Sequence, residues 1–267
     1  MTRTAIIAGS GRLPAAVAAV LDAPLICAVA GFMPEGITPD LHFRIERLVP
    51  LFDALHAAGV ATVTFAGAVQ RPRLDPAMFD AATAQLVPRL IAAMGQGDDA
   101  TLREVVALFE DAGFAVAATA DIAPGLVPGP GLLAGTLTPQ DQSDATRAAA
   151  IVAALGAVDV GQGCVVQQGL CLGVEVLAGT DALLSGIVPL DALRPDPARG
   201  RGLFFKAPKP GQDRRIDLPT LGPDTVLATA QAGLGGIVWQ AGGVICLDLA
   251  DMQTAAAENG LFLWARP

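Results

Sequence analysis

The residues best suited to chemistry in this sequence gather in one proline-rich stretch, residues 204–222. Only 16% of the chain is charged. Lysine and arginine side chains bind phosphate oxygens, whereas aspartate carboxylates bind hard cations. The composition of this stretch therefore suits a phosphate and a metal ion together, although a surface loop with solvated charges explains it equally well. The charged residues of the stretch are Lys206, Lys209, Asp213, Arg214, Arg215 and Asp217.

Three prolines determine the backbone of the same stretch: Pro208, Pro210 and Pro219. Each fixes φ and removes a backbone donor, so the segment forms neither a regular helix nor a central strand. We predict a stiff loop that follows a short apolar strand at 203–206. Such stiffness lowers the entropy cost of holding charged side chains in place.

A glycine-rich turn near the start of the chain is a second candidate site. Residues 4–8 predict a buried strand, residues 9–14 a turn, and residues 15–21 a helix with Pro14 in its first turn. This arrangement suits a phosphate or another anion, and a turn without a ligand explains it as well. The dinucleotide fingerprint Gly-x-Gly-x-x-Gly is incomplete because position 14 is proline, and only Glu35 stands near the expected acidic position.

Two further groups of polar residues stand where predicted elements begin or end. Gly67 and Arg71 follow a strand predicted at 60–66, and loops after parallel strands meet at a ligand-binding edge. Arg71 suits either a phosphate or a neighbouring carbonyl. Asp98 and Asp99 precede a helix predicted at 100–112, where N-capping and the helix dipole explain them. A cation or a sugar hydroxyl is the functional alternative.

The first half of the chain alternates predicted strands and helices, which indicates a mostly parallel, doubly wound sheet. A Pro- and Gly-rich break at 124–135 is the predicted linker. We predict an α/β fold, with a Rossmann-like parallel sheet domain at 1–130 followed by a second, mixed α/β domain at 131–267. The other predictions for the first half are strands at 25–30, 43–48 and 114–118, and helices at 51–58 and 79–94.

The second half predicts a mixed sheet. A hairpin hinged at Gly169 begins it, and Thr180 or Asp181 is predicted to cap the helix that starts near residue 179. Glu175 precedes that helix, near the end of a strand. The predicted strands lie at 164–168, 170–176, 203–206, 236–239, 242–247 and 261–264. A helix is predicted to start at Thr138 or Ser143 and to end near Leu155, and two more lie at 223–232 and 251–259.

Composition excludes several classes of function. A net charge of −9 argues against a nucleic-acid binder. The four cysteines form no Cys-x-x-Cys pair, which favours reduced, buried thiols in a cytosolic protein. We expect no secretory signal and no membrane-spanning run. His42 and His56 lie near no Gly-x-Ser-x-Gly elbow, and no Walker A loop is found.

Seven stretches, in order along nearly the whole chain, resemble the LpxI-type UDP-2,3-diacylglucosamine pyrophosphatases of lipid A biosynthesis. The stretches are Ile-Ala-Gly-Ser-Gly-Arg-Leu-Pro at 7–14, Phe-Ala-Gly-Ala-Val-Gln-Arg-Pro at 65–72, Gly-Asp-Asp-Ala-Thr-Leu-Arg at 97–103, Asp-Val-Gly-Gln-Gly-Cys-Val-Val at 159–166, Glu175 with Gly-Thr-Asp-Ala-Leu-Leu at 179–184, the charged loop at 206–222, and Ala-Gly-Leu-Gly-Gly-Ile at 232–237. Each is weak alone, whereas the ordered set is specific.

The resemblance implies a two-domain enzyme whose substrate lies between a Rossmann-like domain and a catalytic C-terminal domain. It implies Mg²⁺-assisted hydrolysis of UDP-2,3-diacylglucosamine to 2,3-diacylglucosamine 1-phosphate (lipid X) and UMP, with water attacking the phosphorus nearer the sugar. It implies a cytoplasmic protein that meets the inner-membrane surface transiently, and a homodimer is a further option. The alternatives are a non-catalytic nucleotide-sugar binding module and, with less support, a nicotinamide-dependent oxidoreductase.

The same resemblance implies roles for individual residues. Asp217 matches the catalytic aspartate, and an ordinary aspartate, with a pKa of about 3.9, is ionised at neutral pH and suits metal ligation better than proton transfer. Asp213 and Glu175 are the other implied metal ligands. Ser10 stands where a glycine is expected and Gln240 where an acid is expected. The implied substrate-binding residues are Ser10, Gly11, Arg12, Leu13, Gly67, Arg71, Asp98, Asp99, Gln162, Thr180, Asp181, Lys206, Lys209, Gln212, Arg215 and Thr220.

Overall fold

The structure is a computed structural model that describes residues 3–70 and 74–267, and its chain groups into two compact units. The first unit contains the chain up to Pro124 together with the five residues Asp213–Asp217. The second contains Gly125–Gln212 and Leu218–Pro267. The charged, proline-rich loop is therefore divided: its middle belongs to the first unit, and its two ends belong to the second.

The first unit is built on a parallel sheet whose strands are arranged in the order β3-β2-β1-β4-β5. This order reverses beside β1, because the chain passes from β1 outward to β3 and then returns to β4 on the other side. Ligands of open α/β sheets bind at such a reversal, next to the carboxyl ends of the strands. The strands are β1 Arg3–Ala8, β2 Leu25–Val29, β3 Leu41–Phe43, β4 Val60–Ala66 and β5 Ala115–Val116.

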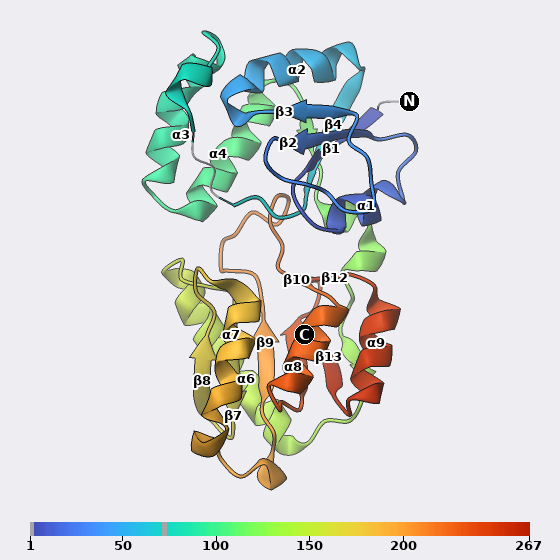
Figure 1. The fold of residues 1–267 in the computed structure, drawn as a ribbon, viewed down its shortest axis with the longest axis vertical. Helices are drawn as coiled ribbons and strands as arrows, with labels where there is room; N and C mark the ends of the chain where they lie inside the picture. Colours follow the sequence, from blue (N-terminus) through green and yellow to red (C-terminus); the bar gives the residue numbers. More distant parts are fainter. Residues whose placement is uncertain (1–2, 71–73) are drawn as a thin grey trace. The chain divides into compact units, whose positions relative to one another are not determined.

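Helices cover both faces of this sheet. Ile7 and Cys27 point into a core that includes Leu51 of α2 and Phe109 of α4. The alternate residues of the strands, such as Ile6, are buried on the opposite face. Figure 1 shows α1 and α2 on opposite sides of the sheet. The helices are α1 Leu13–Ala18, α2 Leu48–Ala57, α3 Val87–Met94, α4 Asp98–Asp111 and α5 Thr119–Ile122.

The second unit contains a six-stranded mixed sheet in the order β6-β13-β11-β9-β7-β8. β9, β11 and β13 are parallel, whereas β6 and β7 are antiparallel to their neighbours. A separate two-stranded ladder joins β10 to β12. The strands are β6 Gly131–Ala134, β7 Gly163–Gln167, β8 Leu170–Val174, β9 Leu203–Lys206, β10 Thr220–Leu221, β11 Gly236–Gln240, β12 Ile245–Cys246 and β13 Phe262–Arg266.

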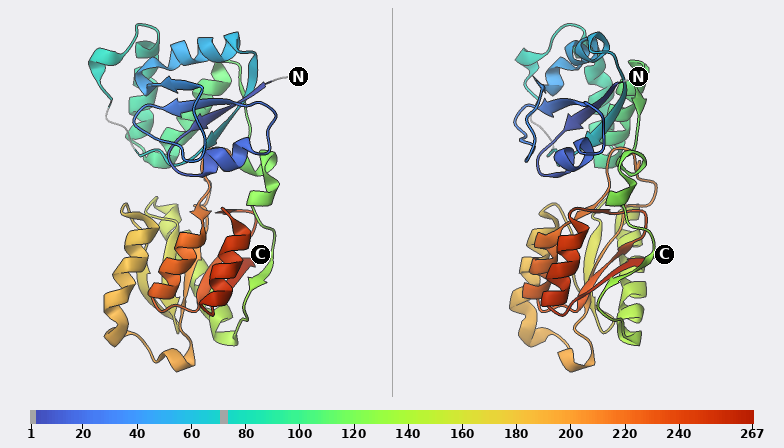
Figure 2. Two further views of the ribbon diagram at one scale, coloured as in Figure 1. Left: turned by 45° about the vertical axis from the view of Figure 1, so that its right-hand side comes forward. Right: turned by 90° about the vertical axis from the view of Figure 1, so that its right-hand side faces the viewer.

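α7, α8 and α9 cover one face of this sheet and α6 covers the other, as the right-hand view in Figure 2 shows. Phe204 and Trp239 pack toward α7, α8 and α9, whereas Phe205 and Val238 pack toward α6. Thr138 begins α6 with a capping box formed with Asp141. The helices are α6 Pro139–Ala157, α7 Gly179–Ile187, α8 Pro223–Gln231 and α9 Leu249–Glu258.

The predicted fold class is confirmed: a parallel sheet in the first half is followed by a separate mixed sheet in an α/β chain. The strand predicted at 43–48 is wrong, because β3 ends at Phe43 and a 3-10 turn follows at Ile45–Arg47. Glu46, one of the charged residues that alternate with apolar residues in this segment, is buried there and accepts hydrogen bonds from Arg44 and from the Asp75 amide. Its inward position breaks the alternation on which the prediction depended.

Other boundaries also differ from the prediction. The strand predicted at 242–247 is limited to β12, Ile245–Cys246, which pairs with β10 outside the six-stranded sheet. The helix predicted at 79–94 is regular only from Val87, because the Asp80 carboxylate binds the Ala82 and Thr83 amides in a separate turn. The predicted linker at 124–135 contains β6, an edge strand paired with β13.

Candidate functional site

The loops that follow β1 and β4 are joined by backbone hydrogen bonds at the reversal of the first sheet. The Ser10 amide donates to the Ala68 carbonyl at 2.8 Å, and the Ala68 amide donates to the Ser10 carbonyl at 3.0 Å. Gly67 has a φ of +95°, and a Cβ atom placed on it would lie 2.7 Å from the Ser10 carbonyl oxygen. Only glycine fits this approach.

Ser10 also joins a third loop to this pair. Its hydroxyl accepts a hydrogen bond from the Met33 amide at 3.3 Å, and the Gly11 carbonyl accepts one from the Glu35 amide at 2.9 Å. Serine at position 10, where a glycine was expected, therefore binds the loop that follows β2. The loops that follow β1, β2 and β4 are thus held together at this edge of the sheet, mainly by hydrogen bonds between backbone groups.

The neighbouring predicted residues have different surroundings. Arg12 is exposed immediately before α1, and Leu13 is buried as the first residue of that helix. α1 has only six residues, and a proline occupies its first turn. Because this proline has no amide hydrogen and the helix is short, α1 offers few backbone donors for an anion. Arg71 lies outside the described residues.

Charged residues of the divided loop lie along α4 within the first unit. The Arg215 guanidinium donates to the Asp213 carboxylate at 2.6 Å and to the Glu110 carboxylate, also at 2.6 Å. Hydrogen bonds from Arg215 lower the pKa of Asp213, and the positive charge of Arg103 lowers it further. Arg103 in turn pairs with Asp99 at 2.9 Å. Asp99, Asp213 and Arg215, predicted separately, thus belong to one charged row along α4.

Asp98 and Asp99 occupy the first turn of α4, in which Gly97 is the cap residue. The predicted side-chain N-cap is therefore wrong, whereas the predicted placement near the positive end of the helix holds.

Asp217 closes a short turn that begins at Asp213. The amides of Ile216 and Asp217 donate to the Asp213 carbonyl at 3.3 and 3.4 Å. Asp217 is half-buried and is followed by the buried Leu218 and Pro219. The turn and the buried residues that follow it fix the backbone of the predicted catalytic aspartate.

A buried ion pair lies at the carboxyl end of β9 in the second unit. The Lys206 ammonium donates to the Glu175 carboxylate at 3.0 Å and to the Thr180 hydroxyl at 2.5 Å, and this hydroxyl donates to Glu175 at 3.0 Å. Lys206 is 6% exposed and lies 5.9 Å from the centroid of the Phe204 ring. The predicted capping role of Thr180 is wrong, because Ala178 is the cap residue and no side chain caps α7.

The second lysine is held by a different acid. Lys209 pairs with the Asp159 carboxylate, and its amide donates to the Gln212 side chain at 2.9 Å. The Gln212 amide returns a bond to the Lys209 carbonyl at 3.2 Å. Pro210 packs against Gly156 near the end of α6. Three of the predicted residues are therefore brought together at the carboxyl end of β9, namely Glu175, Thr180 and Lys206, and two more, Lys209 and Gln212, in the turn that follows.

The remaining predicted residues of the second unit do not join these groups through their side chains. Asp181 is exposed, and its carbonyl accepts a bond from Ser185. The Thr220 hydroxyl bonds the Leu218 carbonyl at 3.4 Å. Gln162 binds the Ala207 amide through its own carbonyl, and its buried Oε1 has no hydrogen-bond partner among the described residues. Gln162 therefore provides an unused acceptor one residue before Gly163.

The described part of the chain contains no cluster of three or more His, Cys, Asp or Glu side chains that could hold a metal ion. As the side chains stand, Asp213 is engaged by Arg215 and Glu175 by Lys206. Magnesium is commonly held by one or two carboxylates together with substrate phosphates and water, and not by a cage of protein ligands. These side chains therefore form no preformed cage for such an ion, and Asp217 stays a predicted ligand.

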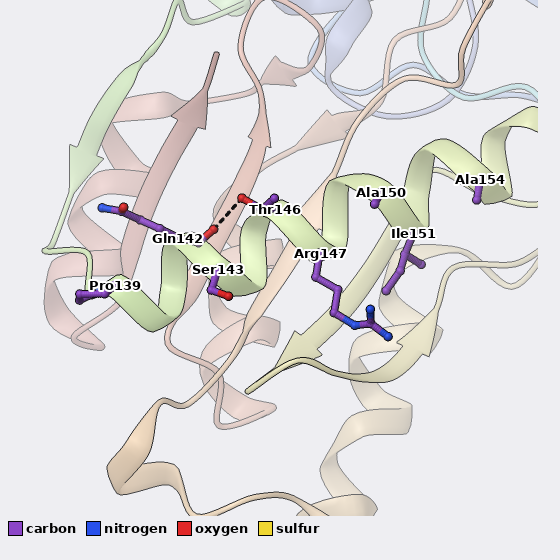
Figure 3. Close-up of a pocket in the computed structure, with 8 residues that line it drawn as sticks. All are labelled: Pro139, Gln142, Ser143, Thr146, Arg147, Ala150, Ile151 and Ala154. Carbon is purple, nitrogen blue, oxygen red and sulfur yellow. Dashed lines mark hydrogen bonds between the residues drawn. The ribbon is translucent and has the colours of Figure 1, made fainter.

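An open groove of about 860 Å³ lies elsewhere, along one face of α6. Figure 3 shows the side chains that line it, all from this helix, with the Thr146 hydroxyl bonded to the Gln142 carbonyl. Arg147 is the one charged side chain in its lining, and none of the predicted site residues belongs to it. The lining residues are Pro139, Gln142, Ser143, Thr146, Arg147, Ala150, Ile151 and Ala154.

Two of the acids that orient the predicted bases, Asp159 and Glu110, were not predicted from the sequence, whereas Glu175 and Asp213 were predicted as metal ligands. Asp159 begins one of the stretches that carry the family resemblance, so its position was a usable signal. Glu110 lies 105 residues from Arg215 in a helix of mixed composition, and nothing in its surroundings distinguishes it from other surface acids.

Comparison with known proteins covers both units. Residues 3–126 match the model of the LpxI N-terminal domain, and residues 130–264 match that of the LpxI C-terminal domain. A curated relative is the UDP-2,3-diacylglucosamine pyrophosphatase LpxI of Caulobacter vibrioides. It is 36% identical over 271 aligned residues, which cover 98% of this chain and 97% of the relative.

Proposed function

This chain belongs to the LpxI family, and from that membership we propose that it hydrolyses UDP-2,3-diacylglucosamine to 2,3-diacylglucosamine 1-phosphate and UMP in lipid A biosynthesis. The observation that carries the proposal is similarity over the full length of both chains to a relative named for this activity. The sequence of the proline-braced loop supports it, because it contains the types of base and acid that hydrolysis of a diphosphate needs.

In the proposed reaction the oxygen of water bonds to the phosphorus nearer the sugar. The bond from that phosphorus to the bridging oxygen breaks, and UMP leaves with this oxygen. The two products together take up the two hydrogens of water. Asp217 would orient the attacking water through its ionised carboxylate. Asp217 would hold the magnesium ion, which would supply Lewis-acid polarisation of the phosphoryl group when bound.

The bases of the loop would neutralise the charge of the diphosphate. Lys206, Lys209 and Arg215 are each oriented by an acid, so their positions are set before the substrate arrives. A hydrogen bond that involves a charged group contributes about 1.5 to 3 kcal/mol. The turn that contains Ser10, together with Gly67, would hold part of the nucleotide sugar.

The acyl chains of the proposed substrate imply a partner surface. We propose a transient contact with the inner-membrane surface, from which a lipid-linked sugar would be taken, and a homodimer as a second assembly to be tested. Within residues 3–70 and 74–267, none of the helices combines the length and the apolar character that a membrane span requires.

The test is an assay of the purified chain with the diacylated UDP-sugar, in which mass spectrometry identifies the products. We expect lipid X and UMP with Mg²⁺, loss of both with EDTA, and incorporation of ¹⁸O from labelled water into lipid X. Asp217→Asn should lower kcat/KM by about 10²- to 10⁴-fold. Asp224→Asn, the same change at an exposed position in α8, is the matched control.

Two results would count against the proposal. Wild-type protein that stabilises on binding the substrate without turnover would be a nucleotide-sugar binding module. Full activity of Asp217→Asn would show that Asp217 takes no part in the reaction, although the chain would still have the proposed activity.

A further inference from the structure

The sequence contains only two lysines among 267 residues, and they are Lys206 and Lys209. The other fifteen basic residues are arginines. Among the described residues, Lys206 is the one base that is buried, and it lies at the end of a central strand. A chain that otherwise uses arginine thus has a lysine, with its compact ammonium group, at this buried position.

The hydrogen bonds of Lys206 leave one donor for an external ligand. An ammonium group has three N–H donors. Glu175 accepts one and the Thr180 hydroxyl accepts another, and the described residues provide no partner for the third. Thr180 donates its own hydrogen to the same oxygen of Glu175, so the three side chains form a closed ring. The ring fixes the direction of the ammonium group.

The backbone around Glu175 is shaped to admit its carboxylate. The Glu175 amide donates to the Gly163 carbonyl at 2.8 Å. A Cβ atom on Gly163 would lie 2.7 Å from the Glu175 carboxylate and 2.9 Å from the Phe204 ring. Gly163 is also the strand partner of Lys206. Any other residue at position 163 would displace the acid that holds the lysine.

A buried ion pair contributes little to stability in comparison with apolar residues of the same size. The presence of this pair therefore indicates a function beyond packing. The Glu175 carboxylate is paired with the Lys206 ammonium group, whereas the family resemblance implies that Glu175 is a metal ligand.

We propose that Glu175 is a positioning residue: with Thr180 it directs the ammonium group of Lys206 toward a phosphate oxygen of the substrate, and it does not bind the metal. This inference rests on the proposed function for the identity of the phosphate. Gly163 contributes to this positioning because it leaves space for the Glu175 carboxylate.

A kinetic double-mutant cycle tests the proposal, with the variants Glu175→Gln, Lys206→Met and the double variant. If Glu175 acts through Lys206, the double variant is no slower than Lys206→Met alone. Displacement of a positioned group by about 1 Å can cost about a hundredfold, so we expect a loss of that order in kcat/KM for Glu175→Gln. The Mg²⁺ concentration for half-maximal rate should stay unchanged. Additive losses, or a raised Mg²⁺ requirement, would overturn the proposal.

Amine acetylation provides a test that does not depend on activity. The chain has only two lysines, Lys206 and Lys209. After treatment with acetic anhydride, peptide mass spectrometry therefore gives the extent of acetylation of Lys206 relative to that of Lys209 as a single ratio. We expect this ratio to rise several-fold in Glu175→Gln. An unchanged ratio would show that Glu175 does not hold Lys206. A raised ratio in a protein that hydrolyses nothing would reject the proposed function and support the positioning.

Gly163→Ala should raise the same ratio, because its Cβ would displace Glu175. Gly186→Ala in α7 is the matched control, since nothing lies within 4 Å of a Cβ atom there. Both alanine variants must first be shown to be folded by their tryptophan fluorescence. An equal ratio of Lys206 to Lys209 acetylation in the two variants would then show that Gly163 does not help to position Glu175. If Gly163→Ala does not fold, the ratio in Glu175→Gln decides alone.

Discussion

The two units have different chemical groups at the carboxyl ends of their parallel strands: backbone groups in the first unit and side chains in the second. In the first unit this edge is closed by backbone, through the bridge between Ser10 and Ala68 and the close approach of Gly67. In the second unit the edge presents side chains, in the ring formed by Lys206, Glu175 and Thr180. The backbone contacts of the first unit fix the shape of its sheet edge, whereas the side-chain hydrogen bonds of the second unit fix the position of charged groups at its sheet edge.

The difference determines which substitutions each unit should tolerate. The backbone groups at the sheet edge of the first unit lie in contact and leave no room for an added methyl group. A glycine-to-alanine substitution there should therefore destabilise the unit through steric overlap. A buried charge pair should fail when one partner is neutralised, because the other charge remains in a poorly solvated place. Each unit therefore has its own kind of sensitive residue.

Gly67→Ala should have the largest effect on stability. Its φ of +95° is unfavourable for alanine, and its Cβ would overlap the Ser10 carbonyl. We expect a loss of about 4 kcal/mol in the free energy of unfolding of the first unit. Labelling of Cys27 measures it, because burial raises the pKa of this thiol to about 12 and the thiol reacts only when the unit opens.

Gly95→Ala is the control for this prediction. It lies in the same unit, its φ is −71°, and the nearest atom to its Cβ would be 3.6 Å away. If the two alanine variants lose equal stability, the first edge does not depend on close backbone contact.

Glu175→Gln should have the next largest effect, in the second unit. Removal of one partner from a buried ion pair costs about 3 kcal/mol. Both tryptophans of the chain, Trp239 and Trp264, belong to the second unit, so fluorescence-detected urea unfolding reports on it. Glu258→Gln, at an exposed position in α9, is the control. A loss below 1 kcal/mol would mean that the ring is as weak as a surface pair.

The contrast between the units also explains what the sequence could predict. Strands such as β1 and β4 follow from short β-branched runs, and α6 from the capping signal at Thr138. The turn at Ile45–Arg47 escaped prediction because Glu46 is a charged residue that turns inward. Its hydrogen bonds depend on Asp75, which local periodicity does not include.

The site was predictable in its residue types and less so in its pairings. The composition of residues 204–222 indicated charge and stiffness, and the structure assigns that charge to specific partners. Arg215 binds Glu110 from 105 positions away, and Lys209 binds Asp159 from 50 positions away. Such pairs form only after the chain has folded, so no pattern within a short window contains them. The grouping of Asp213–Asp217 with the first unit has the same origin.

Asp213→Asn tests a charge that belongs to the first unit although it lies between segments of the second. Arg215 lowers the pKa of Asp213 in the folded state, so the ionised form stabilises the fold above the unfolded pKa. We expect a cost of about 1 to 2 kcal/mol at pH 7. The difference from wild type should shrink as the pH falls below the unfolded pKa of about 4, and it should vanish once the pH is below the lowered folded pKa, where Asp213 is protonated in both states. Labelling of Cys27 in urea at neutral pH, and far-UV circular dichroism at low pH, measure it. A difference that persists undiminished at low pH would show that Asp213 acts through packing and not through charge.

The smallest effect should come from Asp111→Asn, the same chemical change at an exposed position of the first unit. Asp111 pairs with Arg89 at 2.8 Å, but its side chain is 63% exposed and that of Arg89 is 43% exposed. Water already solvates both groups, and Arg89 keeps a second partner in Glu104. We therefore expect a loss of about 0.5 kcal/mol or less, which 1 M salt should abolish. The measurement is the Cys27 assay used for Asp213→Asn. Equal losses for Asp111→Asn and Asp213→Asn would contradict the distinction between charges that the fold positions and charges that solvent screens, and with it the account of how the charged loop is held.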